Sequence, residues 1–297
     1  THHVVSRCIQ GFAFLTPRPE IVSVCTGVLG HSLATYQDTI QLHHYVFLSN
    51  HFHLLLSSKD SVSLAQFMCH FKSNLARELA RIHDWHGSFW QSRYASEEIL
   101  DEDGLIDIFT YITQNSVKEG LVDHPRAWLG LHGYHQLVDH KDVKGPWINR
   151  TQLYWARKRS KDVLLADFTT QYPIDLTAPP LWAHLNESEY FTLCHQLCHD
   201  AINEARQKYG KPAMGMSLVL AQPVFTARFT QRSSRPLCRT KCIERLKAYR
   251  ALYKAFKAQF QLAFAILREG IYMGVTLLDV QFPEGGVPLF GGYMAPS

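Results

Sequence analysis

The sequence has little that would place it among membrane, fibrous or disordered proteins. No apolar run reaches the roughly 18 residues that a membrane span needs, and Thr1 opens no signal peptide. There is no Gly-X-Y or heptad repeat, and charged residues are only 19% of the 297 residues, against 46% hydrophobic ones. Seven cysteines, an odd number, argue against a secreted disulfide framework. We therefore expect one large or two ordinary domains, without a membrane segment, in a reducing, cytoplasmic setting.

Several familiar site signatures are also missing. The chain has no glycine-rich phosphate loop and no Gly-x-Ser-x-Gly elbow, so kinase and hydrolase functions have no motif here. Two cysteine pairs, Cys194/Cys198 and Cys238/Cys242, are spaced four residues apart rather than as Cys-x₂-Cys. A structural zinc site on these four residues stays an alternative, and buried free thiols are the simpler interpretation.

Positive charge is concentrated in one segment. The net charge is only +4, but residues 226–257 hold ten Lys or Arg and one acid, Glu244. The rest of the chain then has 20 basic and 25 acidic residues, a balance of −5. A basic segment on a mildly acidic body is typical of proteins that bind a phosphate backbone, although a solvated helix face would look the same.

Hydrophobic periodicity predicts a mixed α/β first third. We expect strands at 2–8, 45–48, 52–56 and 89–100, helices at 61–83 and 103–117, and a helix at 19–36 that Gly27 and Gly30 weaken. Beyond residue 142 a Pro- and Trp-rich stretch precedes helical patterns at 187–209 and 239–268, and a turn-rich tail follows at 282–296. This predicts three parts: a domain at 1–142, a wrapping extension at 143–180 and a helical basic region at 181–297.

The most informative string is NHFHLLL at 50–56. Alternate side chains of a strand share a face, so His51 and His53 project side by side while Phe52 enters the core. Two neutral imidazoles in this arrangement suit a divalent metal. His-x-His alone is a weak signal in a chain with 17 histidines.

A second candidate lies on the helix predicted within 101–122. Its apolar stripe leaves Asp107, Tyr111 and Asn115 on a separate polar face at four-residue spacing. The simplest role for Tyr111 is packing against a neighbouring element. A tyrosine nucleophile at neutral pH would need a nearby metal or charge.

Four strings together resemble the HUH single-tyrosine transposases, and most of all the REP-associated tyrosine transposases and their insertion-sequence relatives. The strings are HVVSRC near the start, SNHFHLLL, FWQSRY and YITQNSVKEGLV, in family order over roughly residues 2–135. The later half is similar to extended members of the family in TAPPLW, RSSRPLC and FPEGGVP.

The resemblance implies an α+β fold of the HUH endonuclease type: a ferredoxin-like (RRM-like) antiparallel sheet with helices on one face, followed by a mostly helical extension. It implies that His51, His53 and Asn115 bind Mg²⁺ or Mn²⁺ and that Tyr111 is the nucleophile. The usual Asn-Pro-Val reads Asn115-Ser116-Val117 here, which relaxes the helix end and keeps Tyr111 and Asn115 in register.

The implied activity is cleavage and rejoining of single-stranded DNA beside a hairpin, such as a REP-like palindrome, through a 5′-phosphotyrosine. The protein would act as a monomer or homodimer near a bacterial nucleoid. Arg93 is one expected DNA contact, and a basic stripe on the helix at 239–268 is the other. This basic stripe consists of Lys247, Arg250, Lys254 and Lys257. Two alternatives remain, namely a replication initiator or relaxase of the HUH class and a DNA-binding protein that keeps the fold without the chemistry.

Overall fold

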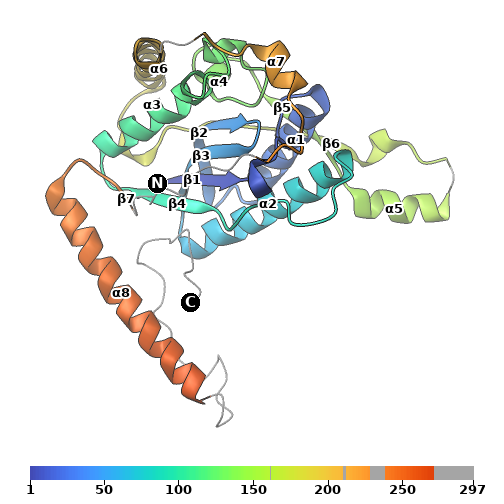
Figure 1. Cartoon of the computed structure of the whole chain (residues 1–297). Coiled ribbons are helices and arrows are strands. Elements are labelled where there is room, and N and C mark those ends of the chain that lie inside the picture. Colours follow the sequence, from blue (N-terminus) through green and yellow to red (C-terminus); the bar gives the residue numbers. More distant parts are fainter. Residues whose placement is uncertain (161, 210–211, 228–237, 271–297) are drawn as a thin grey trace.

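A five-stranded sheet forms the centre of the protein in the computed structural model, which describes residues 1–160, 162–209, 212–227 and 238–270 (Figure 1). The strand order is β2-β3-β1-β4-β7. The strands are β1 (His2–Arg7), β2 (Ile40–Leu48), β3 (His51–Ser58), β4 (Ala95–Ile99) and β7 (Cys238–Arg239). The first four pair antiparallel, and β7 joins β4 in parallel. The β-α-β-β-α-β order of the first part is the ferredoxin-like topology that the resemblance implied.

Two helices cover one face of the sheet. Helix α1 (Pro19–Thr35) connects β1 to β2, and α2 (Ser61–Ile82) connects β3 to β4. Pro19 occupies the first turn of α1, where its missing N–H costs nothing, and the Asp60 carboxylate caps α2 through the Ser63 N–H. Their apolar sides and the sheet enclose a core in which Phe52 is fully buried.

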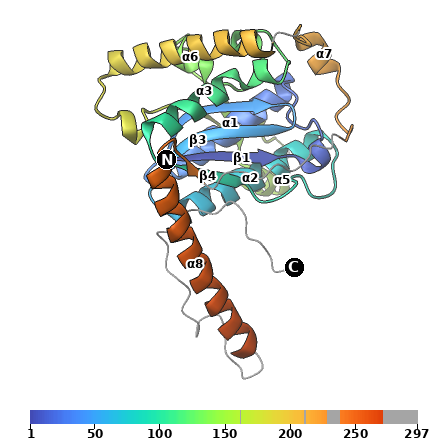
Figure 2. The same ribbon diagram turned by 60° about the vertical axis from the view of Figure 1, so that its left-hand side comes forward.

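The opposite face is covered by α3 (Glu102–Lys118), with α6 (Glu187–Tyr209) packed outside it (Figure 2). The resemblance implied helices on one face, which holds for α1 and α2, whereas α3 crosses to the other face. The reason is that Val46, Leu48 and Leu55 point to that face and need an apolar cover, which the stripe of α3 supplies.

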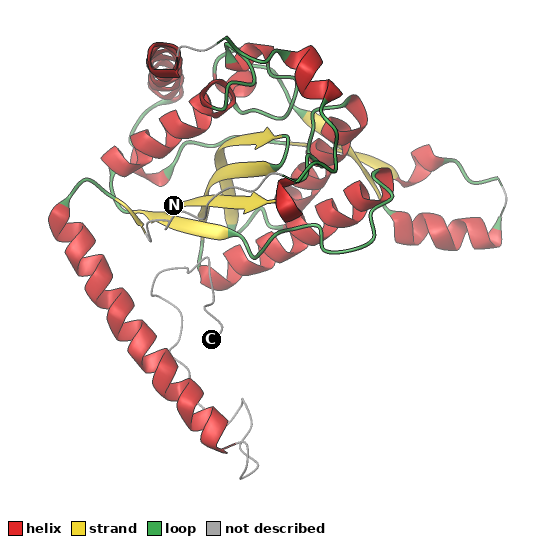
Figure 3. Ribbon diagram, viewed as in Figure 1, coloured by secondary structure: helices red, strands yellow, loops and turns green. Residues whose placement is uncertain are grey.

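The segment predicted as a wrapping extension forms a second, two-stranded sheet. Strands β5 (Lys144–Ile148) and β6 (Thr169–Pro173) pair antiparallel and flank α5 (Arg150–Arg159). This sheet lies against α1, and a Cβ at Gly27 would overlap the Pro146 carbonyl. Gly27 therefore permits close packing of α1 rather than weakening it. Short helices occur in the connections throughout the described chain: η1 (Ile9–Gly11), η2 (Pro125–Ala127), α4 (Tyr134–Leu137), η3 (Leu165–Phe168), η4 (Pro180–Trp182) and α7 (Met216–Ala221) (Figure 3).

One predicted strand is partly wrong. Of residues 89–100 only Ala95–Ile99 form a strand. The preceding residues form a loop that α2 holds, because the Trp90 indole donates to the Lys72 carbonyl at 3.0 Å and the Lys72 ammonium donates to the Ser92 carbonyl at 3.0 Å. The backbone also pairs with the end of β1 at one antiparallel bridge, Cys8 with Trp90, so these residues stay beside β1 without forming a continuous strand.

The last described helix, α8 (Ile243–Gly270), extends away from the sheet layers (Figure 1). All four residues of the basic stripe are exposed on it. The predicted turn-rich tail and most of RSSRPLC lie outside the described residues. Among the described helices none combines the length and apolar character needed to cross a membrane.

Candidate active site

His51 and His53 lie side by side on the α3 face of β3, as strand alternation predicted. Both are buried, and their ring centroids are 5.0 Å apart. The Asn50 amide donates to the Gly11 carbonyl and presents its oxygen to His51 Nδ1 at 2.6 Å. Because an amide oxygen only accepts, His51 Nδ1 carries the proton and Nε2 keeps the lone pair.

Tyr111 is brought to this histidine pair by α3. Its ring meets the His53 ring edge-on with 5.3 Å between centroids, and the Lys118 ammonium lies 4.4 Å from its ring centre. The side chain is half-buried, so part of it is exposed to solvent. The structure therefore joins the two separate sequence signals, on a strand and on a helix, in one cluster.

Asn115 lies one turn beyond Tyr111 on α3 and is fully buried. Within the described chain neither its amide oxygen nor its amide nitrogen has a hydrogen-bond partner. A buried amide without partners costs roughly 1–3 kcal/mol, so it calls for a ligand or a water.

These residues fit a divalent metal when the Asn115 oxygen is counted. No three His, Cys, Asp or Glu side chains form a metal-binding group among the described residues. His51, His53 and the Asn115 amide, which lacks a hydrogen-bond partner within the described chain, would supply two nitrogens and one oxygen.

A third histidine, which sequence reasoning missed, lies in the same cluster. His3 of β1 is buried, and its Nε2 is 2.9 Å from His53 Nδ1. Its Nδ1 faces Glu97 of β4, whose carboxylate also accepts from Arg239 of β7 at 2.8 Å. The HVVSRC string contained His3, but only the β1–β3 register shows that it shares a face with His53.

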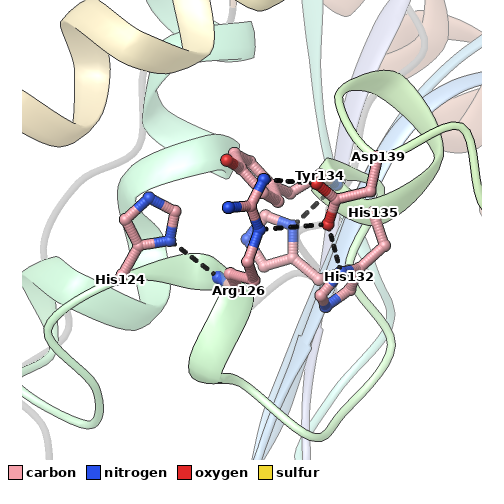
Figure 4. A network of polar contacts seen from close by, with 6 residues as sticks. All are labelled: His124, Arg126, His132, Tyr134, His135 and Asp139. Carbon is pink, nitrogen blue, oxygen red and sulfur yellow. Dashed lines mark hydrogen bonds and ion pairs between the residues drawn. The ribbon is translucent and has the colours of Figure 1, made fainter.

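Two further histidines hold α3 in place through Thr113, which lies between Tyr111 and Asn115. His44 Nε2 donates to the Thr113 hydroxyl at 3.0 Å, and His132 Nε2 donates to the Thr113 carbonyl at 3.2 Å. His132 Nδ1 accepts from the Tyr134 N–H at 3.0 Å (Figure 4). Burial lowers the pKa of His132 to about 3, so it is neutral at physiological pH.

A polar network next to His132 ties the chain after α3 together. Asp139 accepts from His135 at 3.1 Å and forms an ion pair with Arg126, whose guanidinium lies over the Tyr134 ring (Figure 4). The His135 and Arg126 contacts outweigh the effect of burial and lower the pKa of the Asp139 carboxyl. Arg126 belongs to η2, which contacts α3, so the network supports the helix that carries Tyr111.

The residues predicted to contact DNA are all exposed. Arg93 is exposed in the loop before β4, and the basic stripe is exposed on α8. Both remain predictions about DNA.

The zinc alternative is wrong for the described residues. Cys194 and Cys198 of α6 are buried in the apolar layer with α3, and burial raises the pKa of both thiols to about 12. Cys238 belongs to β7 at the sheet edge, and Cys242 is exposed. Within the described chain these four cysteines do not gather into a metal-binding group.

One protein-family model matches part of the chain. The family model of IS200-like transposases matches residues 30–115, a segment that contains His51, His53, Tyr111 and Asn115. This match confirms the resemblance drawn from the sequence strings over that segment, and it supports a transposase role. No curated protein sequence matches the chain significantly.

Two solved structures are similar at low identity. One is a REP-associated tyrosine transposase bound to a REP hairpin, with 17% identity over 46% of this chain and 76% of that chain, and a TM-score of 0.32. The other is a provisionally assigned transposase from Deinococcus radiodurans R1, with 18% identity over 37% of this chain and 86% of that chain, and a TM-score of 0.29. At these TM-scores neither likeness defines what this chain does.

Proposed function

We propose that this protein is a DNA strand transferase that cleaves and rejoins single-stranded DNA beside a hairpin through a 5′-phosphotyrosine. One observation carries the proposal: Tyr111 of α3 lies edge-on to His53 of the His-x-His strand, with 5.3 Å between ring centroids. Both residues belong to the segment that matches the IS200-like transposases.

The chemistry follows from the residues around Tyr111. The phenol loses its proton and its oxygen attacks phosphorus, while the bond from phosphorus to the 3′-oxygen breaks and that oxygen takes up a proton. Lys118, which lies over the Tyr111 ring, offsets the negative charge that develops on the phenol and the phosphate. The bond energy is kept in the phosphotyrosyl link, so a second 3′-hydroxyl can rejoin the strand without ATP.

His51, His53 and Asn115 would hold Mg²⁺ or Mn²⁺ at this cluster. When bound, the ion polarises the scissile phosphate as a Lewis acid. The chain's own contribution is rigid placement of the donors, since His51 is fixed by Asn50 and α3 is fixed by His44 and His132.

DNA binding would use the exposed basic residues. The basic stripe on α8 and Arg93 offer exposed positive charge for phosphates. A protein that binds hairpin DNA but does not cleave it is the alternative, and the same exposed basic residues would serve it.

Covalent trapping on a labelled hairpin oligonucleotide with a single-stranded flank tests the proposal. With Mn²⁺ present we expect a protein–DNA adduct that survives denaturing electrophoresis and is lost in Tyr111→Phe. Tyr94→Phe is the control, because Tyr94 lies before β4 and packs with the core on the other face of the sheet. Hairpin binding without any adduct in the wild type would favour the non-cleaving candidate.

A further inference from the structure

We propose that His3 and Glu97 are positioning residues that fix His53 in the tautomer a metal ligand needs, with Arg239 holding the Glu97 carboxylate in place. This inference rests on the proposed metal role of His53. It is tested by a property of the metal-free, DNA-free protein.

The four side chains form one hydrogen-bonded chain across the sheet. His53 Nδ1 and His3 Nε2 are 2.9 Å apart, and the two rings are stacked with 5.1 Å between centroids. His3 Nδ1 faces Glu97 Oε2 at 3.4 Å, a long contact, and Arg239 Nε donates to the same oxygen at 2.8 Å. His3, His53 and Glu97 are each at most 5% exposed, so water does not compete for these contacts.

Strand pairing explains why these residues meet. His3 pairs with Glu97 of β4 and lies diagonally from His53 of β3, so all three project from one face of neighbouring strands. Arg239 reaches the same carboxylate because β7 pairs with β4 at the edge. Arg239 of β7 thereby completes the cluster that starts with His53 of β3.

The direction of each hydrogen bond follows from the carboxylate. An ionised Glu97 only accepts, and burial, which by itself raises its pKa, is outweighed by the contacts from His3 and Arg239, which lower the pKa. His3 Nδ1 therefore donates to Glu97, and a neutral His3 must accept at Nε2. His53 Nδ1 then carries the proton, which leaves the lone pair on Nε2.

That tautomer is the one in which His53 Nε2 can bind a metal. His51 reaches the same state through the Asn50 oxygen. His51 is thus oriented by its neighbour in the chain, Asn50. His53 is oriented by His3, Glu97 and Arg239, which come from β1, β4 and β7. Outer contacts of this kind change metal affinity by roughly 10- to 100-fold when removed.

The first test is ¹⁵N NMR of the ring nitrogens in histidine-labelled, metal-free protein. We expect the His53 proton on Nδ1 in the wild type. Phe at position 3 keeps a stacked ring and removes the acceptor, so His3→Phe should shift His53 toward the Nε2–H form that free imidazole side chains favour. His2→Phe is the matched control, because His2 is equally buried on the opposite face of β1.

The second test is Mn²⁺ binding without DNA, followed by calorimetry. We expect His3→Phe and Glu97→Gln to weaken binding by about tenfold or more, and His2→Phe and Glu98→Gln to change it less than about twofold. Glu97→Gln keeps the side-chain shape, so it still tests the proposal if the His3→Phe protein does not fold.

Three results would overturn the proposal: a wild-type His53 protonated on Nε2, a tautomer unchanged in both variants, or equal loss of Mn²⁺ affinity in the controls. Absence of adduct formation with the expected tautomer and Mn²⁺ affinity would instead count against the proposed function alone.

Discussion

Acid should destabilise the fold through His132, and the size of the effect can be worked out. The neutral ring of His132 makes two hydrogen bonds: Nε2–H donates to the Thr113 carbonyl, and Nδ1 accepts from the Tyr134 N–H. Protonation places an N–H of His132 against the N–H of Tyr134 in a fully buried site. The perturbation is therefore a pH titration, compared between the wild type and His132→Asn, whose side-chain oxygen still accepts from Tyr134.

The magnitude follows from the pKa difference between the two states. The pKa of His132 is lowered from 6.5 to about 3 in the folded protein, chiefly by burial. Below pH 6.5 the unfolded chain takes up a proton that the folded chain does not, so the free energy of unfolding falls as pH falls, until about pH 3. The slope is about 1.4 kcal/mol per pH unit, which makes a loss of about 2 kcal/mol at pH 5.

Urea unfolding between pH 5 and pH 8, followed by tryptophan fluorescence, measures this slope. Other buried histidines add to the wild-type slope, among them His43, whose burial lowers its pKa to about 4. The difference in slope between the wild type and His132→Asn isolates His132, and we expect about 1.4 kcal/mol per pH unit. His86→Gln, at a ring 90% exposed, should leave the slope unchanged. Equal slopes in the wild type and His132→Asn would refute the reasoning.

Three further outcomes test separate parts of the molecule. His51→Ala should abolish cleavage and leave hairpin binding nearly intact by gel shift, whereas equal loss of both would argue against a purely catalytic role. Replacing all four residues of the basic stripe with Gln should reduce the slope of log K against log salt by about 3, and an unchanged slope would make the stripe a solvated face. Gly27→Ala should lower the free energy of unfolding by about 1–3 kcal/mol, because the new methyl group meets the Pro146 carbonyl. Ser23→Ala on the same helix should change it by less than about 0.5 kcal/mol, and equal effects would mean that the contact with β5 is unimportant.

Local patterns predicted most of the first 142 residues. The strands, the helix at 61–83 and the helix of Tyr111 follow from periods of two and 3.6 residues, which depend only on neighbours in the chain. The pairing of His51 with His53 and the separate polar face of Tyr111 were predictable for the same reason.

Features that depend on distant contacts could not be predicted in this way. The position of α3 on the opposite face depends on which strand residues need cover, and the contact of His3 with His53 depends on the β1–β3 register. The path of residues 89–94, which were predicted as strand, depends on contacts of Trp90 and Ser92 with Lys72 of α2, a residue distant in the chain. The small sheet of β5 and β6 could not be predicted, because its residues are mostly half-buried or exposed and do not alternate regularly between buried and exposed positions.

The central claim is that the Tyr111 oxygen becomes linked to DNA, and locating the adduct by mass spectrometry tests it most directly. Trypsin releases residues 94–118 as one peptide that holds both Tyr94 and Tyr111, so a further cut after Glu102 is needed to separate them. After reaction with the hairpin substrate and nuclease digestion, we predict the nucleotide phosphate on the fragment with Tyr111. A phosphate on Tyr94 or on another tyrosine such as Tyr134, or an adduct that persists in Tyr111→Phe, would contradict the claim.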